Sequence, residues 1–200
     1  MNIAFLMGSF DPIHIGHINM IRLALQSGMI DKVIVVPSGH NPWKKQEPAS
    51  FNLRIEMIEA AIKPFGKSCS VSTIESAFEP PYYANKSLNH FKERYKEDNL
   101  FILCGEDTVC KIPKWKDAEK DILPFYNVIV IDRGNDIKNV YFSCLGDYAK
   151  KVFPVFGKTL SVSSTEIREI IKKTNNAYNA YPLIHEETCR IIECNNLYKP

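Results

Sequence analysis

Two histidines three positions apart carry the first clear chemistry in the chain. His14 and His17 follow a glycine turn that opens with Gly8, Ser9 and Phe10. Residues three apart share one face of a helix, so both imidazoles should face one ligand if a helix begins near His14. A helix N-terminus disfavours a cation but attracts an anion, because its N–H groups and dipole point outward. The pattern predicts a phosphate site, with a capping or core histidine as the alternative.

A second cluster suited to phosphate lies between Ser163 and Arg168. Ser163 and Glu166 have the spacing of a capping box, which predicts that a helix begins here. Its first turn would present Ser164, Thr165 and several N–H groups without intrahelical partners. Arg168 lies about one turn further along, so its guanidinium can reach the same helix end. Taken alone, the stretch is equally compatible with a well-capped helix that binds nothing.

Three further stretches contain candidate binding residues. Lys44 lies in a polar segment that is either a solvent loop or a lid whose lysines meet distal phosphates. Asp107, in Gly105-Glu106-Asp107, follows an apolar run and can accept hydrogen bonds from a ribose or cap a helix. Trp115 precedes Lys116 and follows another lysine, a setting that suits either stacking under an aromatic ring or core packing.

The elements that must position these groups follow from the apolar pattern. Six apolar runs have the length of buried strands, and we expect strands at about residues 3–7, 31–37, 69–74, 99–104, 126–131 and 152–156. Helical spacing between and after them predicts helices at about residues 18–25, 51–65, 88–95 and from 163 onward. This alternation is typical of an α/β fold, a Rossmann-like doubly wound parallel sheet in which ligands bind where strands end.

Composition limits the class of protein. With 45% hydrophobic and 11% aromatic residues, the 200-residue chain can bury the core of one domain, its C-terminal helical part starting at about residue 160. The net charge of +2 does not favour nucleic acid or an anionic membrane as a partner. No apolar run is long enough for a membrane span, and a strand opens the chain without a basic leader. We therefore expect a cytoplasmic protein, with the nucleus as the alternative.

Six cysteines are spread along the chain, at Cys69, Cys104, Cys110, Cys144, Cys189 and Cys194. They form no Cys-x-x-Cys pair, which argues against a structural zinc site, and we predict no protein-bound metal. Because the sequence shows no secretion signal, we expect reduced thiols, most of them small core residues.

Both phosphate clusters resemble signatures of the nucleotidylyltransferase superfamily. Residues 8–17, Gly-Ser-Phe-Asp-Pro-Ile-His-Ile-Gly-His, are similar to its Gly-Ser/Thr-Phe-Asp-Pro turn followed by His-x-Gly-His. Residues 162–168, Val-Ser-Ser-Thr-Glu-Ile-Arg, are similar to its second signature, Ile-Ser-Ser-Thr-x-Ile/Val-Arg. Class I aminoacyl-tRNA synthetases share the His-x-Gly-His half, but their Lys-Met-Ser-Lys-Ser signature is absent from this sequence. The resemblance implies the nucleotidylyltransferase type of α/β fold.

Over nearly the whole chain, the resemblance is closest to bacterial-type nicotinate mononucleotide adenylyltransferases. Trp115 matches the tryptophan on which that family stacks its pyridine ring, and Arg133 matches a family arginine. The family's Pro-Ser-Tyr-Thr-x-Asp-Thr-Leu is matched at three positions from Pro81 to Leu88, but Ala84 replaces its threonine and Lys86 its aspartate. Recognition there is therefore expected from backbone N–H groups.

The resemblance implies transfer of AMP from ATP to nicotinate mononucleotide in NAD biosynthesis, with Mg²⁺ bridging the phosphates. It implies catalytic roles for His14, His17 and Arg168. ATP would be bound by Gly8, Ser9, Phe10, Lys44, Gly105, Asp107, Ser163, Ser164 and Thr165. The mononucleotide would be bound by Tyr83, Ala84, Trp115, Lys116 and Arg133.

Two other functions remain open at this point. Pantetheine-phosphate adenylyltransferases share both signatures, and a nucleotide-binding sensor could share them without turnover. The expected partners are small molecules, and the sequence leaves the oligomeric state open, a homo-oligomer included.

Overall fold

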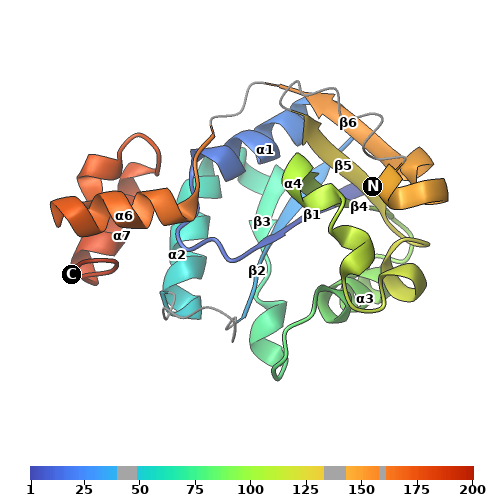
Figure 1. Cartoon of the computed structure of the whole chain (residues 1–200), viewed down its shortest axis with the longest axis horizontal. Coiled ribbons are helices and arrows are strands. Elements are labelled where there is room, and N and C mark those ends of the chain that lie inside the picture. The colour runs from blue at the N-terminus through green and yellow to red at the C-terminus, as the bar shows by residue number, and fades with distance from the viewer. Residues whose placement is uncertain (40–48, 133–142, 158–160) are drawn as a thin grey trace.

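Six parallel strands form the centre of the molecule, in the order β3-β2-β1-β4-β5-β6 (Figure 1). The structure, a computed structural model, describes residues 1–39, 49–132, 143–157 and 161–200. The strands are β1 (Asn2–Gly8), β2 (Lys32–Pro37), β3 (Cys69–Val71), β4 (Asn99–Gly105), β5 (Asn127–Asp132) and β6 (Val152–Phe156). The predicted doubly wound parallel sheet is confirmed. Its strand order reverses between β1 and β4, the switch point beside which such sheets bind ligands.

Helices cover both faces of this sheet. They are α1 (Ile15–Gln26), α2 (Phe51–Ile62), α3 (Ala84–Arg94), α4 (Glu106–Val109), α6 (Ser164–Thr174) and α7 (Glu186–Cys194). Short 3-10 or π turns connect them at η1 (Lys63–Ser68), η2 (Ile74–Ala77), η3 (Ile112–Lys114), η4 (Ala118–Ile122), η5 (Gly146–Lys151) and η6 (Ala177–Ala180). No helix in the described ranges has the length and hydrophobicity of a membrane span.

Alternate residues of each strand supply two cores, because successive side chains point to opposite faces. In β1, Leu6 packs with α1, α2, α6 and α7, whereas Phe5 packs with α3 and η4. The core around Leu6 also contains Ile171 of α6 and Ile192 of α7. Because the C-terminal helices share this core with the sheet, we propose that residues 1–200 form one domain.

Two predicted elements end earlier than expected. The third strand stops at Val71, three residues before η2 begins, although the Ser72 N–H still donates to the carbonyl of Val35 in β2. The helix expected to reach about residue 65 ends at Ile62, because Pro64 cannot donate a helical hydrogen bond, and the 3-10 turn η1 follows from Lys63.

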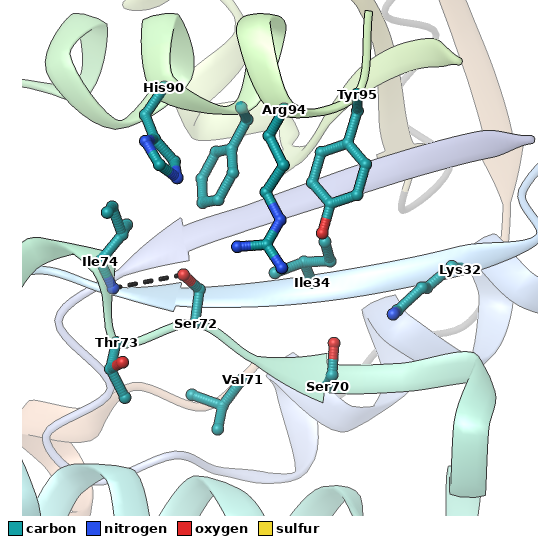
Figure 2. Close-up of a pocket in the computed structure, with 11 residues that line it drawn as sticks. Lys32, Ile34, Ser70, Val71, Ser72, Thr73, Ile74, His90, Arg94 and Tyr95 are labelled. Atoms are coloured by element: carbon teal, nitrogen blue, oxygen red, sulfur yellow. Dashed lines mark hydrogen bonds between the residues drawn. The ribbon is translucent and has the colours of Figure 1, made fainter. Parts of the chain in front are cut away.

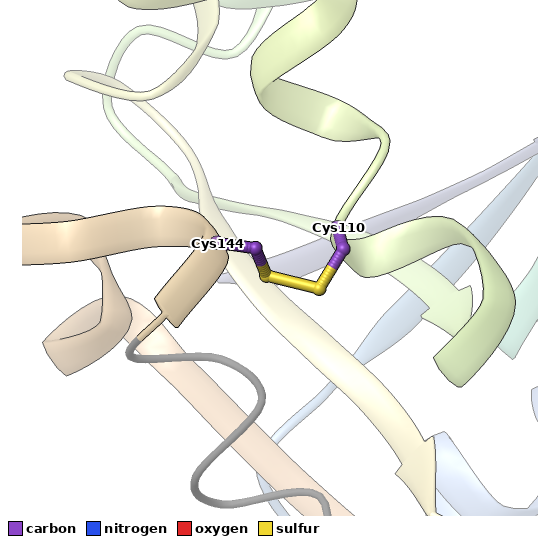
Figure 3. The surroundings of a disulfide bond; sticks show 2 residues. All are labelled: Cys110 and Cys144. Carbon is purple, nitrogen blue, oxygen red and sulfur yellow. A yellow bond between two sulfur atoms is a disulfide. The ribbon is translucent and has the colours of Figure 1, made fainter.

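The prediction that every cysteine is reduced was wrong for one pair. Cys110 and Cys144 form a disulfide (Figure 3), and their Cα atoms lie 5.4 Å apart. They are 34 residues apart in the chain, so no local sequence spacing predicts this disulfide. Cys69, Cys104 and Cys189 are buried free thiols, as expected for core residues.

Candidate active site

The turn after β1 brings the two histidines together, as their spacing predicts. His14 is the N-cap of α1, and its ring stacks on that of His17 with centroids 3.7 Å apart. The backbone N–H of His14 donates to Nδ1 of His17 at 3.3 Å. Because Nδ1 is then an acceptor, a neutral His17 carries its proton on Nε2. The ring is thereby oriented as a hydrogen-bond donor.

Burial keeps His17 neutral. It lowers the pKa of His17 well below the ordinary value, since desolvation penalises the charged imidazole, and the nearby His14 lowers it further. Phe10 closes one side, with its ring edge-on to that of His17 at a centroid distance of 4.9 Å. In the absence of a ligand, His17 therefore faces the site as a neutral donor rather than a cation.

The glycines of this turn make room for aromatic rings. A Cβ on Gly8 would lie 3.1 Å from the ring of Phe10, and a Cβ on Gly16 would lie 3.0 Å from the ring of His14. Both rings would have to move if these positions carried side chains. Phe10 itself has a positive φ of 48°, a conformation that non-glycine residues adopt at a cost of order 1–3 kcal/mol.

The second cluster forms the predicted capped helix and docks on the first. Ser163 is the N-cap of α6, and its hydroxyl accepts a hydrogen bond from the backbone N–H of Glu166 at 3.1 Å. Ser164 Oγ donates to the carbonyl of Pro12 at 2.9 Å. These contacts place the N-termini of α1 and α6 beside one another.

Arg168 reaches the same place. Its Nη1 donates to the backbone carbonyl of Asp11 at 2.7 Å and lies 3.9 Å from the Asp11 carboxylate. Its Nη2 donates to Thr165 Oγ1 at 3.2 Å. The guanidinium is thus fixed between the two signatures, as expected, although 22% of the side chain stays exposed.

Asp11, to which we assigned no role, holds the turn from several sides. It is only 3% exposed, and its Oδ1 accepts from the Ala49 N–H at 3.0 Å and from the Tyr198 hydroxyl at 2.6 Å. Burial raises the pKa of Tyr198, so the phenol stays protonated and donates. The C-terminal end of the chain therefore braces the histidine turn.

Arg54 is a second residue whose role the sequence did not reveal. It is 2% exposed, and its Nη1 donates at 2.7 Å to the carbonyls of both Ser9 and Ser38, which follow β1 and β2. Desolvation lowers the pKa of Arg54 from its ordinary value. A signal existed, because Arg54 precedes buried Met57 and Ile58 by three and four residues and so lies on the buried face of α2.

The predicted mononucleotide residues that the structure describes lie at or near the start of α3. Tyr83 is the N-cap of α3 and Ala84 its first residue, so backbone N–H groups open towards this end. Lys116 Nζ lies 4.7 Å from the centroid of the Tyr83 ring, and Asn85 donates to the Asp117 carboxylate at 3.0 Å. Trp115 is partly buried against the core on this side of the sheet. The segment around Trp115 therefore lies next to the α3 N-terminus.

Glu75 ties this segment to the strand ends. The buried carboxylate accepts from the Gly39 N–H at 2.7 Å and from the Ser87 hydroxyl of α3 at 2.8 Å. The start of α3 is thereby fixed near the carboxyl end of β2. Sequence reasoning overlooked Glu75, which lies in a short segment with no regular pattern.

Gly105 and Asp107 lie where β4 ends, beside β1. Gly105 is the N-cap of α4, so Asp107 belongs to the first turn and does not occupy the capping position. Its side chain is 75% exposed and lies 4.0 Å from Lys111 Nζ. Lys44 and Arg133, the other predicted binding residues, lie outside the described residues.

Comparison with known proteins identifies a family. The cytidylyltransferase-like family model matches residues 5–170. A probable nicotinate-nucleotide adenylyltransferase of Methylacidiphilum infernorum is 34% identical over 199 residues, covering 99% of this chain and 92% of that relative. One from Clostridium botulinum strain Alaska E43 is 35% identical, covering 96% and 95%. The structure of Plasmodium falciparum nicotinic acid mononucleotide adenylyltransferase complexed with NaAD superposes with a TM-score of 0.80 at 25% identity, covering 98% of this chain and 97% of that one.

Proposed function

Because this chain belongs to the cytidylyltransferase-like family, among its nicotinate-nucleotide adenylyltransferases, we propose that the two signature turns hold ATP and the α3 segment holds the acceptor. The reaction joins AMP from ATP to nicotinate mononucleotide, giving nicotinate adenine dinucleotide and pyrophosphate, in NAD biosynthesis. The enzyme class and acceptor predicted from the sequence are thereby confirmed. The relatives give no support to the pantetheine-phosphate or sensor alternatives.

The observation that carries the ATP assignment is the docking of one signature on the other. Ser164 bonds to Pro12 and Arg168 to Asp11, so two helix N-termini, two imidazoles and a guanidinium converge at one edge of the sheet. All of these groups stabilise negative charge. The triphosphate of ATP is the substrate group that such a set would recognise.

In the proposed mechanism the protein supplies no nucleophile. The phosphate oxygen of the mononucleotide attacks the α-phosphorus of ATP, and the bond to the pyrophosphate oxygen breaks. Because that phosphate is largely ionised near neutral pH, no general base is needed. Catalysis comes from alignment of the two anions and from donors aimed at the charge that moves onto the α-phosphate and the pyrophosphate.

We assign His17 and His14 to the α-phosphate region and Arg168 to the β- and γ-phosphates. Because Nε2 of the neutral His17 ring carries the proton, it can donate a hydrogen bond to an α-phosphate oxygen. Two of the five N–H donors of Arg168 bond to Asp11 and Thr165, which orients the planar fork. Ser164 and Thr165 add the first-turn N–H groups of α6, and Lys44 and Asp107 would contact the distal phosphates and the ribose.

The acceptor side is proposed to recognise a carboxylate and an aromatic ring. The backbone N–H groups after Tyr83 would donate to the carboxylate of nicotinate, and Trp115 would stack on its ring. Lys116 and Arg133 would add positive charge for the mononucleotide phosphate.

Mg²⁺ is the expected companion of ATP. The described part of the chain has no group of three His, Cys, Asp or Glu residues that could hold a metal ion by itself. The ion, which accepts oxygen ligands and keeps several waters, would therefore be held mainly by the phosphates. It would neutralise charge on the departing pyrophosphate. A cytoplasmic location, the lack of nucleic-acid and membrane partners, and a homo-oligomeric state also stay proposals.

An assay of pyrophosphate release tests the function directly. ATP would be combined with nicotinate mononucleotide, nicotinamide mononucleotide or phosphopantetheine as separate acceptors. We expect the fastest release with nicotinate mononucleotide. Pyrophosphate release with phosphopantetheine and with no other acceptor would identify a pantetheine-phosphate adenylyltransferase. ATP binding without pyrophosphate release for any acceptor would identify a nucleotide-binding sensor.

A further inference from the structure

A polar cavity of about 320 Å³ lies between α3 and the edge strand β3 (Figure 2). None of the proposed active-site residues that the structure describes lines it. Figure 2 shows His90, Arg94 and Tyr95 reaching from α3 towards the strands, with Lys32 of β2 and Ser70 of β3 on the opposite side. The cavity is therefore a separate feature of the molecule.

The cavity exists because α3 covers the centre of the sheet rather than its edge. The ring of Phe91 on α3 stacks on Phe5 of β1 with centroids 4.4 Å apart. Ser70 pairs with Ile34 on the face that α3 only partly covers, whereas its neighbour Cys69 is buried in the core on the other face. The strip of β2 and β3 beside α3 is consequently only partly covered, and it presents Lys32 and Ser70 beside the apolar Ile34 and Val71.

The cavity concentrates hydrogen-bond donors and positive charge. Among the described residues, its lining includes three basic side chains and four hydroxyl groups but no carboxylate: Lys32, His90, Arg94, Ser70, Ser72, Thr73 and Tyr95. Within the described ranges, no ion pair joins any of the three basic side chains to an acidic one. Ser72 Oγ accepts from the Ile74 N–H at 3.3 Å, so its own O–H remains a donor.

We propose that this cavity is a binding site for a small phosphate-bearing anion, either inorganic phosphate or a phosphomonoester. Cationic donors with hydroxyls around them match the oxygens of a phosphoryl dianion, and the planar fork of Arg94 suits two of those oxygens at once. The volume lies at the lower end of the range for small-molecule sites, which suits a compact ligand. The site does not depend on the proposed adenylyl transfer.

The test is a titration of the full ¹⁵N-labelled chain with inorganic phosphate, and separately with glycerol 3-phosphate, followed by amide shifts. Saturable shifts are expected in residues 70–74 and 90–95. Lys32→Ala and Arg94→Ala should each weaken binding about tenfold, as loss of a charge-assisted hydrogen bond does. Both side chains lie at the cavity surface, so each single variant is expected to keep the fold.

Lys92→Ala is the matched control. It removes one positive charge from the same helix, but Lys92 Nζ lies 4.0 Å from the centroid of the Phe125 ring and does not line the cavity. The affinity of Lys92→Ala for phosphate should equal that of the unmodified protein. Tighter binding of glycerol 3-phosphate than of inorganic phosphate would identify a phosphomonoester as the ligand, and the reverse order the free ion.

Phosphate can also enter the proposed active site, so the titration is repeated in Arg168→Ala. The shifts in residues 70–74 and 90–95 should persist there. The inference is overturned if phosphate moves only amides of the two signatures, or if Lys32→Ala and Arg94→Ala leave the shifts in these two segments unchanged. Full adenylyl transfer in Arg168→Ala, with intact shifts in these two segments, would overturn the proposed role of Arg168 alone.

Discussion

Neighbouring groups fix both the protonation state and the ring orientation of His17. The His14 N–H fixes Nδ1 as an acceptor, and burial among rings lowers the pKa of His17. A neutral imidazole keeps its Nε2 proton available to a phosphate oxygen whose charge grows during the reaction. This arrangement makes His17 the residue whose replacement should affect chemistry more than binding.

His17→Ala should therefore lower kcat about a hundredfold or more, with a smaller change in the KM for ATP. His90→Ala, which removes a histidine outside the candidate active site, serves as the control and should retain normal kcat. Circular dichroism would confirm that both variants are folded. Near-normal kcat in folded His17→Ala would remove His17 from the mechanism.

The lowered pKa of His17 also predicts how stability depends on pH. Below its ordinary pKa of about 6.5, unfolded His17 binds a proton that the folded protein excludes, so the unfolded state is favoured as pH falls. The free energy of unfolding should decrease from about pH 6.5 downward, and His17→Gln should show a shallower decrease. Urea unfolding at a series of pH values measures both slopes. Parallel curves for the two proteins would show that His17 is not desolvated.

Arg168 offers both a positive charge and a planar guanidinium that can bond to two phosphate oxygens at once. Arg168→Ala should raise the KM for ATP and lower kcat, and Arg168→Lys should recover only part of the loss, because an ammonium lacks the two-pronged fork. Arg190→Ala, at an exposed position on α7, removes the same charge elsewhere. ATP titrations and steady-state rates of the three variants give the answer. Unchanged values in Arg168→Ala would reduce the second signature to a capped helix.

At the scale of elements, we propose that the start of α3 and the segment around Trp115 set the choice of acceptor. The N-terminus of α3 offers backbone donors, which suit the carboxylate of nicotinate but face the NH₂ of the amide donor to donor. The contact of Lys116 with the Tyr83 ring holds the two segments together.

We expect kcat/KM to be higher for nicotinate mononucleotide than for its amide. Because backbone supplies the donors, Ala84→Ser should leave this preference unchanged. Trp115→Ala should raise the KM for the acceptor roughly five- to hundredfold, since stacking of a base on an aromatic side chain contributes about 1–3 kcal/mol, with little effect on the KM for ATP. Equal kcat/KM values for the two mononucleotides would contradict the assignment of residues 81–85.

At the scale of the whole molecule, the C-terminal end of the chain packs against the turn that follows β1. Tyr198 donates to Asp11 at 2.6 Å, across 187 residues, and α6 places Arg168 on the same aspartate. The C-terminal helices thus complete a candidate site whose histidines come from the start of α1.

Tyr198→Phe tests this closure. Loss of the hydroxyl leaves the buried Asp11 one donor short, which should lower the free energy of unfolding by about 1–3 kcal/mol. The KM for ATP should also rise, because the turn that carries the histidines loses a brace. Tyr178→Phe, at an exposed position near the same helices, is the control. If unfolding in urea and the KM for ATP matched those of the unmodified protein, the contact between Tyr198 and Asp11 would contribute neither to stability nor to the candidate site.

Local spacing in the sequence determined the chemistry of the two signatures. A spacing of three positions between His14 and His17 suffices to stack their rings once a helix begins, and Ser163 caps its own helix within three residues. Strand and helix periodicity likewise predicted the parallel sheet, since burial on both faces leaves a continuous apolar run. Such features depend on neighbours in the chain, and a sequence displays them directly.

Only the tertiary structure decided which distant residues complete the site. Arg54 bonds to Ser9 across 45 residues, Tyr198 bonds to Asp11 across 187, and Cys110 pairs with Cys144 across 34. No periodicity connects such pairs, because their proximity follows from how strands order themselves and how helices pack over the sheet. The polar cavity beside β3 has the same origin, since it results from where α3 settles and not from any motif.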